Sequence, residues 1–232
     1  MALPAPDPSR LLALQRLRGE ITRMQRRRGE ATLLPLDPAL SDLLPGGGLQ
    51  VGAAYSVESS PSLLGALLAP PSQKGNWCAV IGMPTIGVEA LAGFGVDLSR
   101  LLLVPDPGPR WLTITSALSE VVPLVAVRPS SPPRASDAAR LSARLRDRGS
   151  TLLVTGPWPQ SEGALRLEDP EWHGLHEGWG LLTERTVTVT AVTRQSDVPR
   201  RVRVQLPGPG GTVVPAAAPL AQLADHRLRR AG

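Results

Sequence analysis

The chain has 232 residues, 42% of them hydrophobic, which is enough to bury the core of one large domain. A single cysteine, Cys78, excludes an internal disulfide and a zinc site of several cysteines. No apolar run approaches the roughly 20 residues of a membrane span, and no signal-peptide core is present, so we expect a cytoplasmic protein. The net charge of +5 is concentrated at the ends, because residues 1–30 carry +4 and residues 200–232 carry +5, against −4 in between.

An amphipathic basic helix is predicted within residues 1–30. Asp7 is a good N-cap, Pro8 suits the first helical position, and Gly29 ends the helix. Apolar residues three and four apart form one stripe at Leu14, Leu17, Ile21 and Met24. Arginines surround this stripe at Arg10, Arg16, Arg18, Arg23, Arg26, Arg27 and Arg28. The stripe must be buried against a partner, a second copy or the domain's own core.

Residues 53–155 alternate between short apolar runs and helical segments. The predicted strands are Ala53–Val57, Trp77–Ile81, Leu101–Val104, Val121–Val127 and Thr151–Thr155. The predicted helices are Ser62–Ala69, closed by Pro70-Pro71, then Val88–Phe94, Trp111–Ser119 and Ala135–Arg148. This alternation is typical of an α/β fold with a mostly parallel sheet that is covered on both faces.

The pattern changes towards the C-terminus. Strands without intervening helices are predicted at Ala164–Leu167, Thr186–Thr193 and Arg201–Leu206, with Gln195–Pro199 joining the last two. Alternating Thr and Val indicate an antiparallel hairpin with one solvent-exposed face. Residues 209–232 are predicted to be a Gly/Pro-rich tail that ends in a short helix carrying Arg227, Arg229 and Arg230.

The junction between the first strand of the sheet and its helix is the most informative segment. Residues Tyr55–Leu63 resemble the phosphate-binding junction of the RecA family, Y-G-P-E-S-S-G-K-T, and keep Tyr55, Glu58, Ser59 and Ser60. The glycines, the lysine and the magnesium-binding threonine of that motif are replaced by Ser56, Pro61, Ser62 and Leu63. Proline donates no N–H to a phosphate. The only lysine of the chain, Lys74, follows the helix.

The metal-anchoring half of such a site is also replaced. In P-loop folds an Asp follows a later apolar strand, but here Arg128 follows the predicted strand Val121–Val127. We therefore predict no nucleotide, no metal, no cofactor and no enzymatic activity.

The resemblance to RecA extends over residues 36–208, which we predict to be a degenerate RecA-like core. Leu44–Leu49 resembles the approach to the first RecA strand, Phe94–Leu102 resembles L-G-V-D-I-x-x-L-L, and Arg185–Gly208 resembles the paired C-terminal strands. In place of RecA's two long DNA-binding loops stand only Pro129–Ser136 and Gly156–Gly163. RecA-type strand exchange is therefore not expected.

A RecA-like body without a P-loop, of this length and with Arg-rich ends, resembles the ImuA-prime family of mycobacteria and their relatives. The resemblance implies an accessory of SOS-induced mutagenesis and translesion synthesis, on the nucleoid after DNA damage. It implies as partners ImuB, an inactive Y-family polymerase, and, through it, an error-prone replicative-type polymerase. In RecA-like proteins the N-terminal helix packs against a neighbouring subunit, so the stripe of residues 1–30 is expected to bind a partner or a second copy.

Two other functions remain open. The first is a DNA-binding accessory whose Arg-rich ends hold phosphates weakly, through Arg23, Arg26, Arg27, Arg28, Arg227, Arg229 and Arg230. The second is a cell-division regulator similar to the SulA family. The arginines are equally compatible with a solvated surface that has no ligand.

Two aromatic segments are weaker candidates. Trp172–His176 contains two histidines, but Gly174 argues against a helical metal site and favours a loop packed on the sheet edge. Trp158, Trp172 and Trp179 follow the parallel strands and either cover the core, which we favour, or serve to stack bases or anchor a partner.

Overall fold

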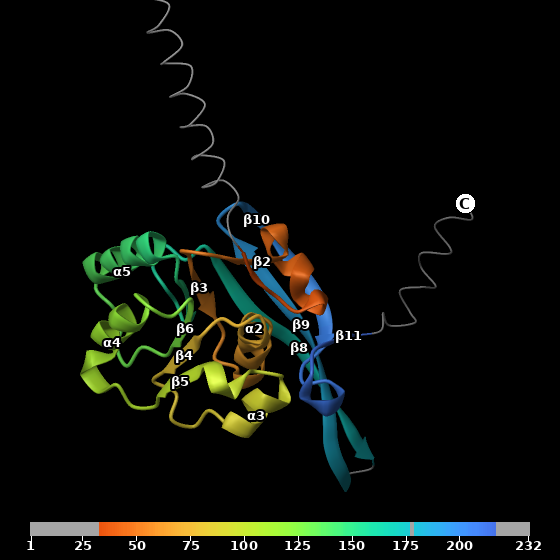
Figure 1. The fold of residues 1–232 in the computed structure, drawn as a ribbon. Coiled ribbons are helices and arrows are strands. Elements are labelled where there is room, and N and C mark those ends of the chain that lie inside the picture. The colour runs from red at the N-terminus through yellow and green to blue at the C-terminus, as the bar shows by residue number, and fades with distance from the viewer. Residues whose placement is uncertain (1–32, 177–178, 217–232) are drawn as a thin grey trace, which may run out of the picture. The chain divides into compact units, whose positions relative to one another are not determined.

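The computed structural model describes residues 33–176 and 179–216 (Figure 1). The chain divides into two compact units, residues 1–32 and 33–232, and only the second contains described residues. The predicted helices of residues 1–30 and 220–230 therefore lie outside the described part.

One nine-stranded sheet forms the centre of the second unit, in the order β11-β10-β9-β8-β3-β7-β6-β4-β5. Its parallel strands are β3 (Ala54–Val57), β4 (Cys78–Ile81), β5 (Leu101–Val104), β6 (Leu124–Val127) and β7 (Thr151–Thr155). Its other strands are β8 (Gly163–His176), β9 (Trp179–Thr193), β10 (Ser196–Gln205) and β11 (Val214–Pro215). The strand β8 pairs with β3 in parallel, and β9, β10 and β11 follow antiparallel. The predicted mixed sheet is confirmed.

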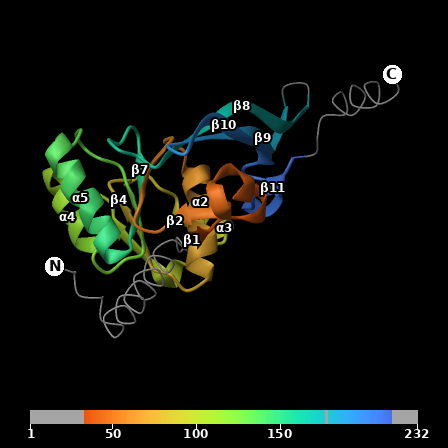
Figure 2. The same ribbon diagram turned by 90° about the horizontal axis from the view of Figure 1, so that it is seen from above.

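Helices cover both faces of the parallel strands, as predicted. They are α2 (Pro61–Gln73), α3 (Val88–Gly93), α4 (Trp111–Leu118) and α5 (Ala135–Arg148). Figure 2 shows α4 and α5 on one side of the sheet and α2 and α3 on the other. Alternate strand residues enter the two cores: Val80 packs with the α2 side, whereas Ala79 and Ile81 pack with the α4–α5 side.

A small two-stranded sheet and 3-10 turns precede and connect these elements. The strands β1 (Leu33–Pro35) and β2 (Gly48–Gln50) pair with each other. The turns are η1 (Pro38–Leu43), η2 (Pro45–Gly47), η3 (Leu98–Arg100), η4 (Gly108–Arg110) and η5 (Pro209–Gly211). Leu40 and Leu43 of η1 are fully buried in the core on the α2 side.

The prediction that α2 closes before Pro70-Pro71 was wrong, because the helix includes both prolines. A proline removes the bond to the carbonyl four residues earlier, but other groups hold this last turn. Ser72 Oγ donates to the Ala69 carbonyl at 2.8 Å, and the Lys74 N–H donates to the Pro70 carbonyl at 3.2 Å. The helix begins at Pro61, one residue earlier than predicted, since proline fits a first helical position.

Strand β6 begins three residues later than predicted. The N–H groups of Val121 and Val122 both donate to the Leu118 carbonyl and so extend the end of α4. Pro123, which has no N–H to donate, then separates this turn from the strand.

The C-terminal hairpin is longer than predicted. The segment Trp172–His176, predicted as a loop, lies in strand β8, and β10 starts at Ser196 after a two-residue turn. Residues 168–171 resemble a turn in sequence but form an irregularity within β8. The pairing register between β8 and β9 shifts between Glu168 and Glu171, and Asp169 has φ of 51°. Figure 1 shows this hairpin projecting beyond the helix-covered part of the sheet.

Candidate functional site

The junction between β3 and α2 keeps the strand–turn–helix path of a phosphate-binding loop. The Ser60 N–H donates to the Glu58 carbonyl at 2.7 Å, which closes the turn after the strand. Ser60 is the N-cap of α2, and its Oγ accepts from the Leu63 N–H at 3.3 Å. With Pro61 at the first helical position, the start of α2 presents fewer N–H groups than a phosphate loop needs.

The residues at the lysine and threonine positions have other partners. Leu63 is fully buried and packs in the core on the α2 side. Ser62 Oγ accepts a 2.8 Å hydrogen bond from Nη2 of Arg185, which lies in β9. Lys74 ends α2 and so lies about 20 Å from the start of this helix, given its rise per residue. The positive charge beside Ser62 is therefore supplied by Arg185 of strand β9 and not by a residue of helix α2.

Several contacts hold the Arg185 guanidinium. Its Nε donates to the Leu206 carbonyl at 2.8 Å, and its carbon lies 5.3 Å from the centroid of the Trp172 ring. Burial lowers the pKa of Arg185, and the nearby Glu58 carboxylate partly offsets this. The sequence had no local signal for this cluster, because 123 positions separate Arg185 from Ser62.

Arg128 also reaches this junction, from the end of strand β6. It follows β6, and its Nη2 donates a 2.6 Å hydrogen bond to Ser59 Oγ. Ser56 replaces the first glycine of the motif and binds the loop after β7. Its N–H donates to Ser161 Oγ at 3.0 Å, and its Oγ accepts from the Trp158 N–H at 3.0 Å. Each hydroxyl of the altered motif thus has a partner within the protein.

Acidic residues are scarce at the neighbouring strand ends. The segment after β4, residues 82–87, contains no Asp or Glu, and Arg128 follows β6. Among the described residues, no group of three or more His, Cys, Asp or Glu side chains could hold a metal ion. His173 Nε2 lies 3.0 Å from Thr186 Oγ1, and the side chain of His176 lies outside the described part.

A cavity of about 440 Å³ opens at the junction. Its polar lining consists of Glu58, Ser59, Ser60, Ser62 and Arg185, and its apolar lining of Pro61, Ile86, Gly87, Ala90, Leu91, Phe94, Leu167 and Pro207. Glu58 Oε2 accepts a 2.7 Å hydrogen bond from the Leu167 N–H, which fixes that carboxylate at the edge of β8. The site therefore combines an apolar wall with charged groups of both signs.

Trp158 and Trp172 lie in different environments. Trp158 is 5% exposed and packs in the core on the α4–α5 side. Trp172 is 51% exposed and stacks on Arg185, which reaches the start of α2 on the other side. The side chain of Trp179 lies outside the described part, and so does the stripe at Leu14, Leu17, Ile21 and Met24. The candidate contact arginines Arg23, Arg26, Arg27, Arg28, Arg227, Arg229 and Arg230 also lie outside it, whereas Arg200, Arg201 and Arg203 lie in β10.

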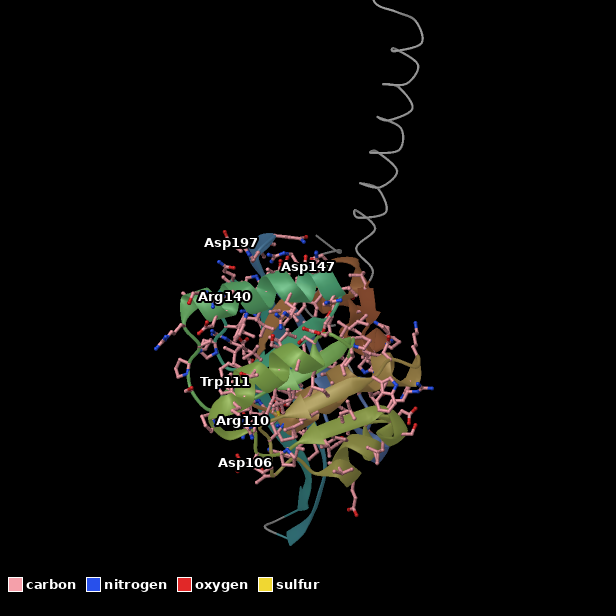
Figure 3. All side chains as sticks on the ribbon, turned by 60° about the vertical axis from the view of Figure 1, so that its left-hand side comes forward. Asp106, Arg110, Trp111, Arg140, Asp147 and Asp197 are labelled. Atoms are coloured by element: carbon pink, nitrogen blue, oxygen red, sulfur yellow. The ribbon has the colours of Figure 1, made fainter. Side chains whose placement is uncertain are left out.

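A second depression of about 380 Å³ lies between α4 and α5. Arg144 forms ion pairs there with Glu120 at 3.4 Å, and Arg140 with Asp137 at 3.7 Å. Figure 3 shows Arg140 and Asp147 on α5, and Trp111 at the start of α4. This depression lies on the face opposite α2 and is separate from the β3–α2 junction.

Fold and junction together define a RecA-like α/β protein, and two solved structures share this fold. The RadB recombinase superposes with a TM-score of 0.58 at 15% identity, over 78% of this chain and 97% of that chain. The flagellar accessory protein FlaH from Methanocaldococcus jannaschii superposes with a TM-score of 0.52 at 10% identity, over 81% of this chain and 100% of that one.

The chain belongs to the family described as MT3502 N-terminal domain, which matches residues 42–160. It is 36% identical over 121 residues to the uncharacterized protein Rv3395c of Mycobacterium tuberculosis. That match covers 50% of this chain and 59% of the relative, so the chain spans less than two thirds of the relative's length. No helix in the described residues is long and apolar enough to cross a membrane.

Proposed function

We propose that the protein is a non-catalytic RecA-like adaptor of a DNA-damage-induced translesion synthesis complex. In this role it binds an ImuB-like inactive Y-family polymerase and, through it, supports an error-prone replicative-type polymerase. The RecA-like fold, the altered junction and the sequence resemblance to the ImuA-prime family support this role.

The observation that carries the proposal is the engagement of both arginines at the junction by hydroxyl groups of the altered motif. Arg128 binds Ser59 and Arg185 binds Ser62, so a phosphate would have to displace these contacts. Phosphoryl transfer further needs a magnesium ligand and a group that positions the attacking nucleophile. The segments after β4 and β6, residues 82–87 and 128–134, contain no Asp or Glu, which supports a role in binding other proteins.

Co-purification tests this role. The full chain is expressed with the Y-family polymerase homologue of its own genome, and the mixture is analysed by size-exclusion chromatography with light scattering. We expect the two proteins to elute together as one complex at micromolar concentration. A catalytically competent replicative polymerase subunit alone serves as the control and is expected to elute separately. Two separate peaks for the Y-family homologue and this chain at micromolar concentration would contradict the proposal.

A DNA-binding accessory is the second candidate. Helix α5 exposes Arg140, Arg144, Arg146 and Arg148, with Asp137, Asp147 and the neighbouring Glu120 as nearby acidic residues. Figure 3 labels Arg140 and Asp147 on this helix. A surface of this kind attracts phosphates by charge and without sequence preference. The salt dependence of DNA binding, given in the Discussion, separates this candidate from the adaptor.

A further inference from the structure

Arg185 has unused hydrogen-bonding capacity beside the cavity at the β3–α2 junction. A guanidinium has five N–H donors, and here Nε and Nη2 bind the Leu206 carbonyl and Ser62 Oγ. Among the described residues, Nη1 has no hydrogen-bond partner. Because its direct hydrogen-bond partners are neutral, the guanidinium can give an incoming carboxylate a charge-assisted bond, which the nearby Glu58 carboxylate opposes in part.

The rest of the lining of this cavity is apolar. Ala90 and Phe94 of the α3 region and Leu167 of β8 line the same cavity as Arg185. A cavity of about 440 Å³ lies within the range of ordinary ligand sites and can admit one large apolar side chain together with an adjacent acidic group. The cavity thus pairs an apolar surface with a fixed cation.

The charge at the junction selects among anionic ligands. Of the charged side chains, Arg185 and Glu58 line the cavity, whereas Arg128 binds Ser59 from outside that lining. A single carboxylate can pair with Nη1 of Arg185, whereas a nucleoside triphosphate carries several negative charges and would face Glu58 without a metal to bridge them. The positions that would supply a lysine and a free N–H are Ser62 and Pro61.

We infer that this cavity, at the place of the lost nucleotide site, is the docking pocket for a segment of the partner protein in which a large apolar residue adjoins an Asp or Glu. The apolar side chain packs against Ala90, Phe94 and Leu167, and the carboxylate binds Nη1 of Arg185. Trp172, exposed on the other side of the guanidinium, keeps it in place. The inference rests on the proposed adaptor function and assigns that function a surface.

Two variants and two matched controls test the pocket. Ala90→Trp fills the cavity from an exposed position of α3 without removing a junction contact, and Arg185→Gln removes the charge. Ala92→Trp adds the same bulk on α3 outside the cavity, and Arg194→Gln removes an exposed charge at the β9–β10 turn. The probes are the purified Y-family homologue and overlapping synthetic peptides that span its sequence, measured by fluorescence anisotropy.

We expect the wild type to bind the homologue and at least one acidic, apolar peptide. Both pocket variants should weaken this binding at least about tenfold, while both controls stay within about twofold. Circular dichroism melting reports whether each variant folds, and Ala90→Trp alone decides if Arg185→Gln unfolds the protein. Mg-ATP should not displace the peptide.

The failures are distinguishable. If the wild type binds the homologue and Ala90→Trp binds it equally well, the pocket is not the docking site and the adaptor function stands. If the wild type does not bind the homologue, the adaptor function and the docking pocket both fall. Displacement of the peptide by Mg-ATP would overturn the inference in favour of a nucleotide site.

Discussion

Arg128 Nη2 and Ser59 Oγ lie 2.6 Å apart and join the end of β6 to the turn between β3 and α2. The two residues are 69 positions apart in the chain and come from the two halves of what would be a nucleotide and metal site. A guanidinium at this place repels a divalent cation and engages a hydroxyl of the loop that would otherwise face a phosphate.

We predict that the protein does not bind nucleotides, because Pro61, Ser62, Leu63 and Arg128 stand where the site needs Gly, Lys, Thr and Asp. Isothermal calorimetry with Mg-ATP should give no heat beyond dilution. A known P-loop ATPase in the same buffer is the positive control. Micromolar binding, or hydrolysis that is abolished by Ser59→Ala or Ser60→Ala, would refute this prediction.

The N-cap of α2 should contribute measurably to stability. Ser60→Ala removes the acceptor of the Leu63 N–H and is expected to lower the free energy of unfolding by about 1 kcal/mol. Ser136→Ala is the matched control, since Ser136 is exposed in the first turn of α5 and its hydroxyl has no hydrogen-bond partner among the described residues, so the change should cost less than about 0.5 kcal/mol. Urea denaturation measures both, and equal effects would show that the cap adds nothing.

Alkaline pH should destabilise the native state. Burial raises the pKa of Cys78 from 9.0 to about 12, and burial likewise raises the pKa of Tyr55 from 10.0 to about 12. Above pH 9 the unfolded chain loses protons that the native state retains, so stability is complete below pH 9 and falls as pH rises towards 12.

Melting temperatures across that pH range measure this effect. Tyr55→Phe should flatten the curve above pH 10, whereas Cys78→Ala should flatten it from pH 9. The native thiol should also resist alkylation at pH 8 and react once the protein is unfolded in urea. Rapid alkylation of the folded protein would contradict the burial of Cys78.

If the Arg-rich ends bind DNA, the affinity should be weak, independent of sequence and steeply reduced by salt. Fluorescence anisotropy across a salt series compares the full chain with variants that lack residues 1–30, residues 217–232 or both. The salt slope should decrease with each arginine-rich segment removed. Binding that survives the removal of both segments would place it on residues 31–216, where the exposed arginines of α5 are one candidate surface.

The apolar stripe of residues 1–30 is expected to serve assembly. Leu17→Asp with Ile21→Asp should leave the melting temperature nearly unchanged and reduce partner binding or self-association at least about tenfold, since each apolar contact contributes about 1.5–3 kcal/mol. Arg16→Asp with Arg18→Asp, outside the stripe, is the matched control. A fall of many degrees in melting temperature would instead place the stripe in the domain's own core.

The sequence predicted the elements whose pattern is local. The strands Leu101–Val104 and Thr151–Thr155 and the helix Ala135–Arg148 have the predicted bounds, because each is a continuous apolar run or a regular amphipathic repeat. The long hairpin was missed because Glu168–Glu171 contains Asp-Pro, which is typical of a turn, whereas pairing with β9 resumes beyond it. The arginine–serine contacts were missed because their partners meet only through the sheet order.

The place of β3 in the sheet has a consequence during synthesis. This strand, residues 54–57, lies between β7 and β8, whose pairing residues begin at Thr151 and Gly163. About a hundred further residues must therefore leave the ribosome after β3 before its first neighbour, β7, is available. The second neighbour, β8, follows a little later. Until then both edges of β3 are open to pairing with other chains, so a ribosome that stalls before β7 would release a fragment in which β3 is unpaired on both edges.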